Sequence, residues 1–339
     1  MVSPDDQGAL FDSPATAGAS PPPDTPVQGA APSAELLALA ATLRERWGDR
    51  LRLGTSSWHF PGWAGQVWAR PDPESLLSRH GLAAYARHPL LRCVSLDRAF
   101  YRALDVATYA RLAAQVDEGF RFVVKAPALL TDAMQREPGS GKALQPNPAF
   151  LDPHIALDAC VRPAAQGLGA RLGALVFQIS PLPLRWQYDP SGPLRRLDLL
   201  WQAVVPELPP GAVAALELRD PWLLTPELAA GLRAHGVRYC LGLHDRMPEA
   251  EAQLPILRAL WPGDFVCRWN LQRGQRYAEA RDRWAPFDRL RAPDLATRAA
   301  IARVARATLD AGQRVFVTIN NKAEGSAPAS VLELARALL

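Results

Sequence analysis

The stretch Ala214-Ala-Leu-Glu-Leu-Arg-Asp-Pro-Trp222 decides the fold expected for this chain. It begins as an apolar run, places Glu217 and Arg219 two residues apart, and stops at a proline. Alternate residues of a β-strand point to the same face, so these two charged side chains project together near the strand's carboxyl end. Burying them is costly unless they face a polar site. The pattern is typical of a strand that contributes to a pocket at the rim of an α/β barrel.

Similar strands recur along the chain and alternate with helical segments. Strands are expected at Leu51–Thr55, Arg92–Asp97, Phe120–Lys125, Gly173–Gln178, around Glu217, and at Val237–Leu243, Asp264–Trp269 and Arg314–Ile319. This alternation indicates a parallel sheet. Eight units in roughly 290 residues match the size of a (β/α)8 barrel, so the predicted fold is an α/β TIM-type barrel. A doubly wound open sheet is the alternative, although no dinucleotide or P-loop glycine motif follows the first strand.

The chain divides into a tail and one domain. Residues 1–32 are rich in Pro, Ala, Ser and Gly, and they carry too few apolar side chains to offset the entropy lost on ordering. We expect this tail to be disordered and residues 33–339 to form a single barrel domain. A leading helix lies within residues 33–48, with Ser33 as its N-cap. The polar connection at residues 131–148 is expected to be a mobile loop.

One island in the tail differs from its surroundings. The run Gln7-Gly-Ala-Leu10-Phe11 resembles the short peptide by which bacterial proteins dock on the sliding clamp of replication. Two apolar anchors and one amide would bind in a pocket of the partner. The alternative is a tail without a partner.

Composition excludes few classes. The chain has 339 residues, 48% of them hydrophobic, and a net charge of +4, which tolerates an anionic partner without demanding nucleic acid. Its four cysteines form no Cys-x-x-Cys pair and are expected to be buried reduced thiols of a cytoplasmic protein. No apolar run approaches the ~20 residues that span a bilayer. The N-terminus lacks the basic and apolar regions of a secretory signal, so no membrane contact is expected.

Nearly every expected strand ends in a polar side chain, and in a barrel these ends meet at one rim. The same-face residues are Gly54, Ser56 and Trp58; Ser95 and Asp97; Lys125; Gln178; Glu217 and Arg219; Arg268 and Asn270; and Thr318 and Asn320, with His244 and Asp245 closing the sixth strand. Structural alternatives stay open for several positions. Asn321 and Asp245 suit turns or helix caps, Lys125 suits a structural ion pair, and Glu217 with Arg219 suits a structural network.

The charges at these strand ends favour an anionic ligand. Lys125, Arg219 and Arg268 outnumber Glu217 and Asp97, so a phosphate or carboxylate group on the ligand would balance them. The catalytic candidates are Glu217 as general acid–base, Lys125 as stabiliser of a developing anion, and Asp245. The candidate binding residues are Trp58, Tyr101, Arg102, Gln178, Arg219, Arg268, Asn270, Tyr277, Asn320 and Asn321.

No cofactor is predicted. A divalent metal on His59, Asp97, Glu217, His244 and Asp245 is the weaker alternative, because no metal-ligand spacing supports it and the neighbouring cations repel a metal ion. No Gly-x-Ser-x-Gly motif supports serine chemistry.

Several motifs occur together and in order over residues 50–339. They include Leu53-Gly-Thr-Ser-Ser-Trp58, Phe100-Tyr-Arg102, Val124-Lys-Ala-Pro127, Glu217-Leu-Arg219, Asp245, Arg268, Tyr277 and Asn320-Asn-Lys-Ala-Glu-Gly325. In these the chain resembles domain-of-unknown-function family 72, the YecE-like proteins. The resemblance implies a TIM-type barrel and carries over rim positions at Trp58, Tyr101, Lys125, Glu217, Arg219, Asp245, Arg268, Tyr277, Asn320 and Asn321. It brings no agreed reaction.

The chain departs from the family pattern at four positions. Ser95 stands where a Glu is usual and Asp97 where an Asn is usual, while Asp220 and Asn270 replace two His residues. These departures put a metal-dependent or two-carboxylate mechanism in doubt.

Three functions follow as hypotheses. The leading one is a barrel that binds a small anionic or phosphorylated ligand at its C-terminal rim, with acid–base or hydrolytic chemistry of a hydrolase or lyase. The second is a nuclease-like barrel associated with nucleic acid and recruited to the sliding clamp through Gln7–Phe11. The third is a ligand-binding barrel without catalysis.

Overall fold

Parallel strands close into a barrel in the computed structural model, which describes residues 26–137 and 140–339. Within those residues the barrel has eight strands, arranged around it in chain order, and the last pairs with the first. They are β1 (Leu51–Thr55), β2 (Leu91–Leu96), β3 (Arg121–Lys125), β6 (Leu172–Gln178), β7 (Val213–Glu217), β8 (Arg238–Leu243), β9 (Phe265–Trp269) and β10 (Val315–Ile319). The predicted (β/α)8 fold is confirmed.

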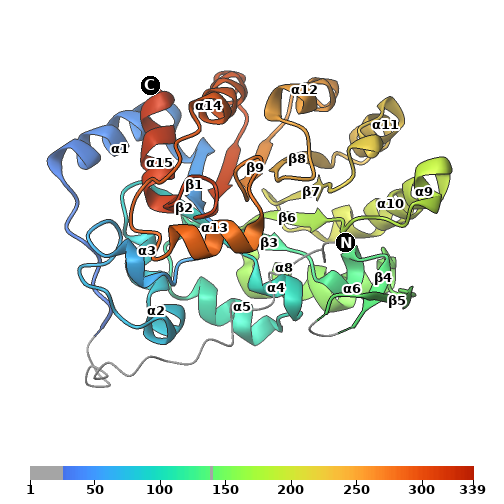
Figure 1. Cartoon of the computed structure of the whole chain (residues 1–339), viewed down its shortest axis with the longest axis horizontal. Helices are drawn as coiled ribbons and strands as arrows, with labels where there is room; N and C mark the ends of the chain where they lie inside the picture. Colours follow the sequence, from blue (N-terminus) through green and yellow to red (C-terminus); the bar gives the residue numbers. More distant parts are fainter. Residues whose placement is uncertain (1–25, 138–139) are drawn as a thin grey trace.

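Helices surround the barrel, as Figure 1 shows. Their N-caps follow from sequence: the side chains of Ser33, Asp105, Thr225 and Asp294 each accept a hydrogen bond from a first-turn backbone N–H. The helices are α1 (Ala34–Trp47), α2 (Glu74–His80), α3 (Leu82–Ala86), α4 (Arg98–Tyr101), α5 (Val106–Ala113), α6 (Ala128–Thr131), α7 (Pro153–Ala156), α8 (Arg162–Leu168), α9 (Arg185–Tyr188), α10 (Ser191–Val204), α11 (Pro226–Ala234), α12 (Ala250–Ala259), α13 (Tyr277–Trp284), α14 (Leu295–Asp310) and α15 (Ala327–Ala337).

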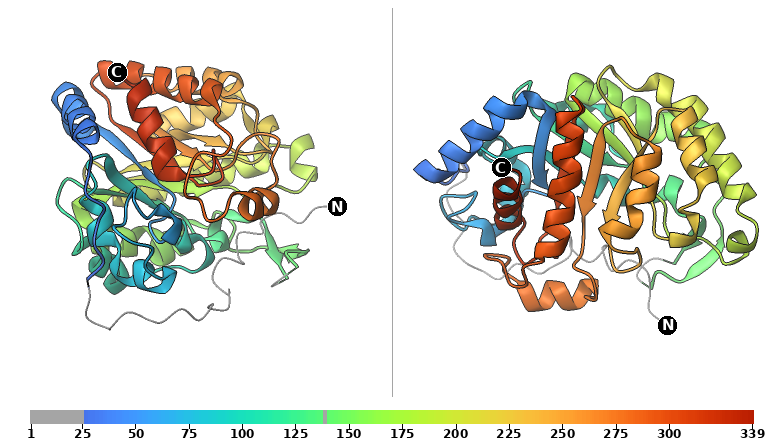
Figure 2. Two further views of the ribbon diagram at one scale, coloured as in Figure 1. Left: turned by 60° about the vertical axis from the view of Figure 1, so that its left-hand side comes forward. Right: turned by 90° about the horizontal axis from the view of Figure 1, so that it is seen from above.

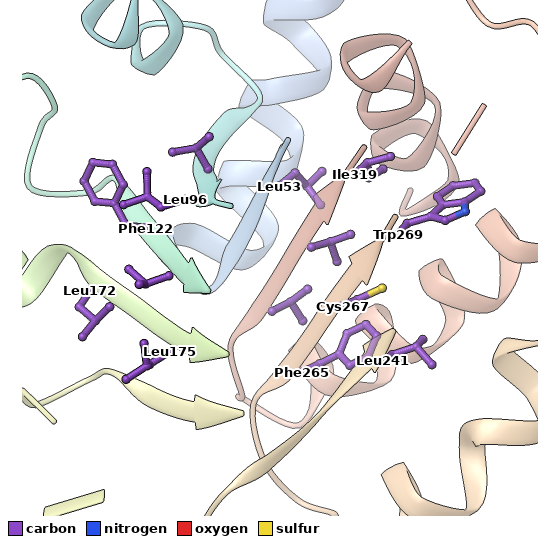
Figure 3. Packing of buried hydrophobic residues seen from close by; sticks show 14 of the residues in the cluster. Leu53, Leu96, Phe122, Leu172, Leu175, Leu241, Phe265, Cys267, Trp269 and Ile319 are labelled. Atoms are coloured by element: carbon purple, nitrogen blue, oxygen red, sulfur yellow. The ribbon is translucent and has the colours of Figure 1, made fainter. Parts of the chain in front are cut away.

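Six of the eight barrel strands, β3 and β6 to β10, contribute to two separate cores because their side chains alternate between faces. The outward side chains, such as Phe122, Cys267 and Trp269, pack against the helices (Figure 3). The inward ones form a smaller apolar cluster inside the barrel: Val123, Ala174, Val176, Ala215, Cys240, Val266 and Phe316. Positions two residues further along each strand therefore point inward as well, at the level of the carboxyl ends.

The tail departs from its prediction over its last residues. Val27 is buried, Ala30 N–H donates to the Val67 carbonyl at 2.9 Å, and Ala69 N–H donates to Gln28 at 3.0 Å. Disorder was therefore the wrong prediction for residues 26–32, because one apolar anchor and backbone pairing hold them to the domain. The candidate clamp residues Gln7, Leu10 and Phe11 lie outside the described residues.

The connection expected to be a mobile loop also contains structure. Its two short strands, β4 (Met134–Arg136) and β5 (Ala143–Pro146), pair antiparallel. The Asp132 carboxylate accepts a hydrogen bond from Arg136 Nε at 2.5 Å and anchors the base of the hairpin. The two strands have only three and four residues and are largely exposed, so they are too short to show an apolar alternation and the sequence did not indicate them.

Two further observations bear on the class of protein. All four cysteines are free and buried, as expected. Among the described residues, no helix combines the length and the apolar composition that crossing a membrane requires.

Substituting Gly54 tests the closure of the barrel. A Cβ at this position would lie 1.8 Å from the Cys93 carbonyl oxygen on β2, so Gly54→Ala must push the two strands apart. We expect the free energy of unfolding to fall by about 3 kcal/mol, or folding to fail. Chemical denaturation provides the measurement.

The matched control is Gly231→Ala within α11, where a Cβ meets no atom within 4 Å. It should leave stability unchanged or raise it by roughly 0.5–1 kcal/mol. A Gly54→Ala protein as stable as wild type would contradict the close strand approach.

Candidate functional site

A layer of polar side chains crosses the barrel directly above the apolar interior. Lys125, Gln178, Glu217 and Arg268 each come two residues after an inward-facing apolar residue of β3, β6, β7 and β9. Gln178 and Glu217 are also register partners across β6 and β7. The parity argument from sequence therefore places these four residues correctly.

Glu217 is the centre of this layer. One carboxylate oxygen, Oε1, accepts hydrogen bonds from Arg219 Nη1 at 2.6 Å and Asn270 Nδ2 at 2.9 Å. The other, Oε2, accepts from Arg268 Nη1 at 2.5 Å. The side chain has no exposed surface. Glu217 and Arg219 project together, as their spacing predicted, and both carboxylate oxygens are hydrogen-bonded to protein partners.

The ionisation of Glu217 follows from these neighbours. Burial raises the pKa of the Glu217 carboxyl, but the charges of Arg219, Arg268 and Lys125 outweigh it and bring the pKa to about 2. Such a carboxylate is a weak base, and no neutral-pH proton transfer suits it. The structural-network alternative for Glu217 therefore fits the geometry better than the predicted acid–base role.

Gln178 and Asp97 extend the network. Gln178 Oε1 accepts hydrogen bonds from Arg219 Nη2 at 2.6 Å and Arg268 Nη1 at 3.3 Å. Asp97 Oδ1 accepts from Arg268 Nη2 at 2.7 Å and from Ser95 Oγ at 2.6 Å. Ser95 thus orients Asp97. The Asp97 side chain is 24% exposed, so it links the buried network to solvent.

Two further contacts border the network. Gly242 on β8 faces Glu217, and a Cβ there would lie 2.8 Å from Glu217 Cγ. The Lys125 ammonium group lies 3.4 Å from the centroid of the Phe100 ring, a cation–π contact. Arg219 and Arg268 form ion pairs with Glu217, Arg268 also pairs with Asp97, and the charge of Lys125 acts on Glu217.

A pocket of about 80 Å³ opens beside this network, at the carboxyl ends of β1, β2 and β10. Asp97 belongs to both the network and the pocket. Figure 2 places α13, which contributes Tyr277, beyond the arrowheads of the strands. The pocket is lined by Ser56, Ser57, Trp58, His59, Phe60, Ser78, Ser95, Leu96, Asp97, Arg98, Tyr101, Tyr277, Asn320 and Lys322.

Lys322 is a pocket residue that sequence reasoning missed. Its side chain is almost fully buried, with Nζ 4.0 Å from the Tyr277 ring centroid and 3.5 Å from Asn320 Oδ1. Burial and the nearby charge of Arg281 lower the pKa of the Lys322 ammonium group to about 7, although the charge of Asp97 opposes the shift. The sequence could have indicated Lys322 as a site residue, because lysine is rare in this chain, with three in total, and Lys322 follows the end of an expected strand.

Arg98 is the second missed residue. Its guanidinium group lies 5.0 Å from the centroid of the Trp58 ring. Its buried Nε has no hydrogen-bond partner, and within residues 26–137 and 140–339 the side chain makes no ion pair. Burial lowers the pKa of Arg98 from its usual value, which reflects how poorly its charge is compensated.

Three predicted site residues lie elsewhere. Arg102 is exposed and does not line the pocket. Asp245 bonds to His244 Nδ1 at 2.5 Å, which lowers the pKa of Asp245, and its side chain is 39% exposed away from the pocket. Asn321 Oδ1 accepts hydrogen bonds from Trp63 Nε1 and Ala327 N–H, so it fastens the start of α15. These positions follow the turn and cap alternatives for Asp245 and Asn321.

The structure also bears on metal binding and on other cavities. Within the part of the chain that the structure describes, no group of three His, Cys, Asp or Glu side chains could hold a metal ion. A larger pocket of about 320 Å³ lies between α12 and α14, beside the first residues of β8 and β9. Its walls are mainly apolar, and it contains none of the polar strand ends.

A family model described as protein of unknown function DUF72 matches residues 52–339. The chain belongs to the DUF72 family. A DUF72 family protein of Enterococcus faecalis V583 superposes with a TM-score of 0.56 at 18% identity, covering 85% of this chain and 95% of that one. A DUF72 family protein of Thermotoga maritima MSB8 gives a TM-score of 0.56 at 18% identity, covering 85% and 98%. These likenesses show a shared fold. No curated protein matches the chain significantly.

Removing the charge of Glu217 tests the network of this DUF72 protein. Glu217→Gln leaves Arg219 and Arg268 buried with less compensation, and we expect a loss of about 3 kcal/mol in the free energy of unfolding. Denaturant titration at pH 7 measures it. The control Glu118→Gln, on the surface, should change little. Equal stability of the two variants would contradict the network.

The same comparison predicts a pH dependence. Because the pKa of Glu217 is lowered on folding, its stabilisation is fully present above the unfolded pKa and is lost as pH falls toward about 2. The stability difference between wild type and Glu217→Gln should therefore shrink between about pH 5 and pH 2. A difference that stays constant across this range would show that ionisation of Glu217 is not its source.

Proposed function

We propose that this DUF72 protein binds a small anionic ligand in the pocket at the carboxyl ends of β1, β2 and β10, and that Lys322 transfers a proton there. One observation carries the proposal. Arg98 and Lys322 line the pocket without a carboxylate ion pair among the described residues, whereas Arg219 and Arg268 are paired with Glu217 and Asp97. The anion-binding role therefore shifts from the buried arginines to Arg98 and Lys322.

Charge compensation supports an anion. A partly buried cation without an ion-pair partner is costly, so Arg98 would stabilise a phosphate or carboxylate in the pocket. The guanidinium group can present two parallel N–H donors to such a group. Ser56, Ser57 and Asn320 line the same pocket and offer neutral hydrogen-bonding groups.

Proton transfer fits Lys322 better than Glu217. A pKa of about 7 leaves the Lys322 amine half protonated near neutral pH, which is the condition for an efficient acid–base group. Glu217 stays ionised under the same conditions. Proton transfer of this kind serves hydrolases and lyases alike.

The nucleic-acid alternative depends on Gln7–Phe11, which lies outside residues 26–137 and 140–339. No observation on those described residues favours it, and the small pocket fits a small ligand better than a polymer.

Anion binding can be measured as thermal stabilisation by inorganic phosphate at constant ionic strength. We expect the wild-type protein to gain stability with rising phosphate, and Arg98→Met to weaken phosphate binding by about tenfold or more, since it removes a charge-assisted contact. Isothermal titration calorimetry gives the affinities.

Arg102→Met is the matched control, because Arg102 is a nearby arginine that is exposed and does not line the pocket. It should bind phosphate as the wild type does. Absence of phosphate binding to the wild type, or equal losses in both variants, would contradict the proposed site.

A further inference from the structure

Lys322 is enclosed in a way that an anion-binding lysine does not need. Its Nζ lies 4.0 Å from the Tyr277 ring centroid and 5.6 Å from the Phe287 ring centroid, and the residue is 1% exposed. Asn320 Oδ1 holds both ends of the residue, at 3.0 Å from the backbone nitrogen and 3.5 Å from Nζ. The amine is therefore fixed in position at the pocket wall, with apolar ring faces around it.

The charges around the amine favour its neutral form. Arg281 on α13 repels the ammonium charge, and Asp97 at the end of β2 is the carboxylate that attracts it. Asp97 is itself held by Arg268, which reduces what it offers to Lys322. Tyr277, also on α13, contributes its ring face. An amine that is desolvated and beside another cation is the environment that activates lysine as a nucleophile.

We infer that Lys322 forms a Schiff base with the carbonyl carbon of a small anionic aldehyde or keto acid, while Arg98 binds the acid group of that ligand. The inference rests on the proposed function for the anionic group and adds the reactive group of the ligand. Both residues line the same pocket of about 80 Å³, which suits a ligand of a few carbon atoms.

The step balances without a further reactant. The neutral Nζ attacks the carbonyl carbon, a C–N bond forms, and the carbonyl π electrons move to oxygen. A proton passes from nitrogen to that oxygen and gives a carbinolamine. Loss of water then breaks the C–O bond and forms the C=N bond. Asp97 lines the pocket and is partly exposed, so it is placed to carry the proton between the two atoms.

The other two lysines of the chain serve as internal controls for the reactivity of Lys322. Lys142 is exposed near the β4–β5 hairpin, and Lys125 is buried against Phe100 without lining the pocket. Together with Lys322 they are all the lysines of the chain. Peptide mapping therefore assigns any modified side-chain amine without ambiguity.

The experiment uses the full chain with glyoxylate and sodium cyanoborohydride, which reduces a Schiff base to a stable carboxymethyl-lysine. At pH 7 we expect Lys322 to be modified at least about tenfold faster than Lys142, because an ordinary exposed amine is almost fully protonated there. The rate at Lys322 should rise to half its maximum near pH 7. Mass spectrometry of peptides measures both rates.

Two variants test the roles of the two residues. Lys322→Arg should lose the adduct at residue 322, because a guanidinium group does not form a Schiff base under these conditions. Arg98→Met should slow the reaction with glyoxylate by about tenfold and leave the reaction with neutral acetaldehyde unchanged.

If Lys322 and Lys142 react at equal rates while phosphate binds normally, the Schiff-base inference is overturned and anion binding stands. If phosphate does not bind and Lys322 still reacts fastest, the nucleophile stands without the proposed function. If neither occurs, both are wrong.

Discussion

The buried carboxylate of Glu217 is the interaction on which the rim of this barrel depends. Arg219 and Arg268 could not remain inside the barrel mouth without a negative charge between them. Glu217 supplies that charge, and its hydrogen bonds fix both guanidinium groups. Arg268 then reaches Asp97 and positions it at the pocket. The position of Asp97 at the pocket wall therefore depends on the fully buried Glu217 carboxylate.

Simple periodicity was enough to predict the barrel and its inner polar layer. A buried parallel strand appears in the sequence as a short apolar run. Because residues two apart share a face of the strand, the inward direction of Gln178, Glu217 and Arg268 could be predicted from their positions. Asn270 lies on the same face as Arg268, past the end of β9, as expected, and its side chain donates a hydrogen bond to Glu217. These predictions succeeded because the backbone geometry that supports them is regular.

The pocket itself was harder to predict, because its residues follow the strands instead of lying on them. Arg98 begins α4 and Lys322 lies in a turn, so no strand period assigns a face to either of them. The connection that contains α13 has too few apolar residues to indicate a helix. Asp245 belongs to the same class, since the turn after β8 directs it to His244. Sequence indicated which rim carries the site, whereas the tertiary structure decides which side chains face it.

The contact between Gly242 and Glu217 couples the substitutions that evolution can accept at these two positions. Because a side chain at residue 242 would occupy the space of the carboxylate, a lineage could lose the glycine only after shortening or removing the acid. Removing the acid first would leave Arg219 and Arg268 buried without their shared carboxylate. Neither step is neutral alone, so drift at this rim is confined to paired changes. A DUF72 chain with a larger residue at this β8 position is therefore expected to have rebuilt its whole arginine network.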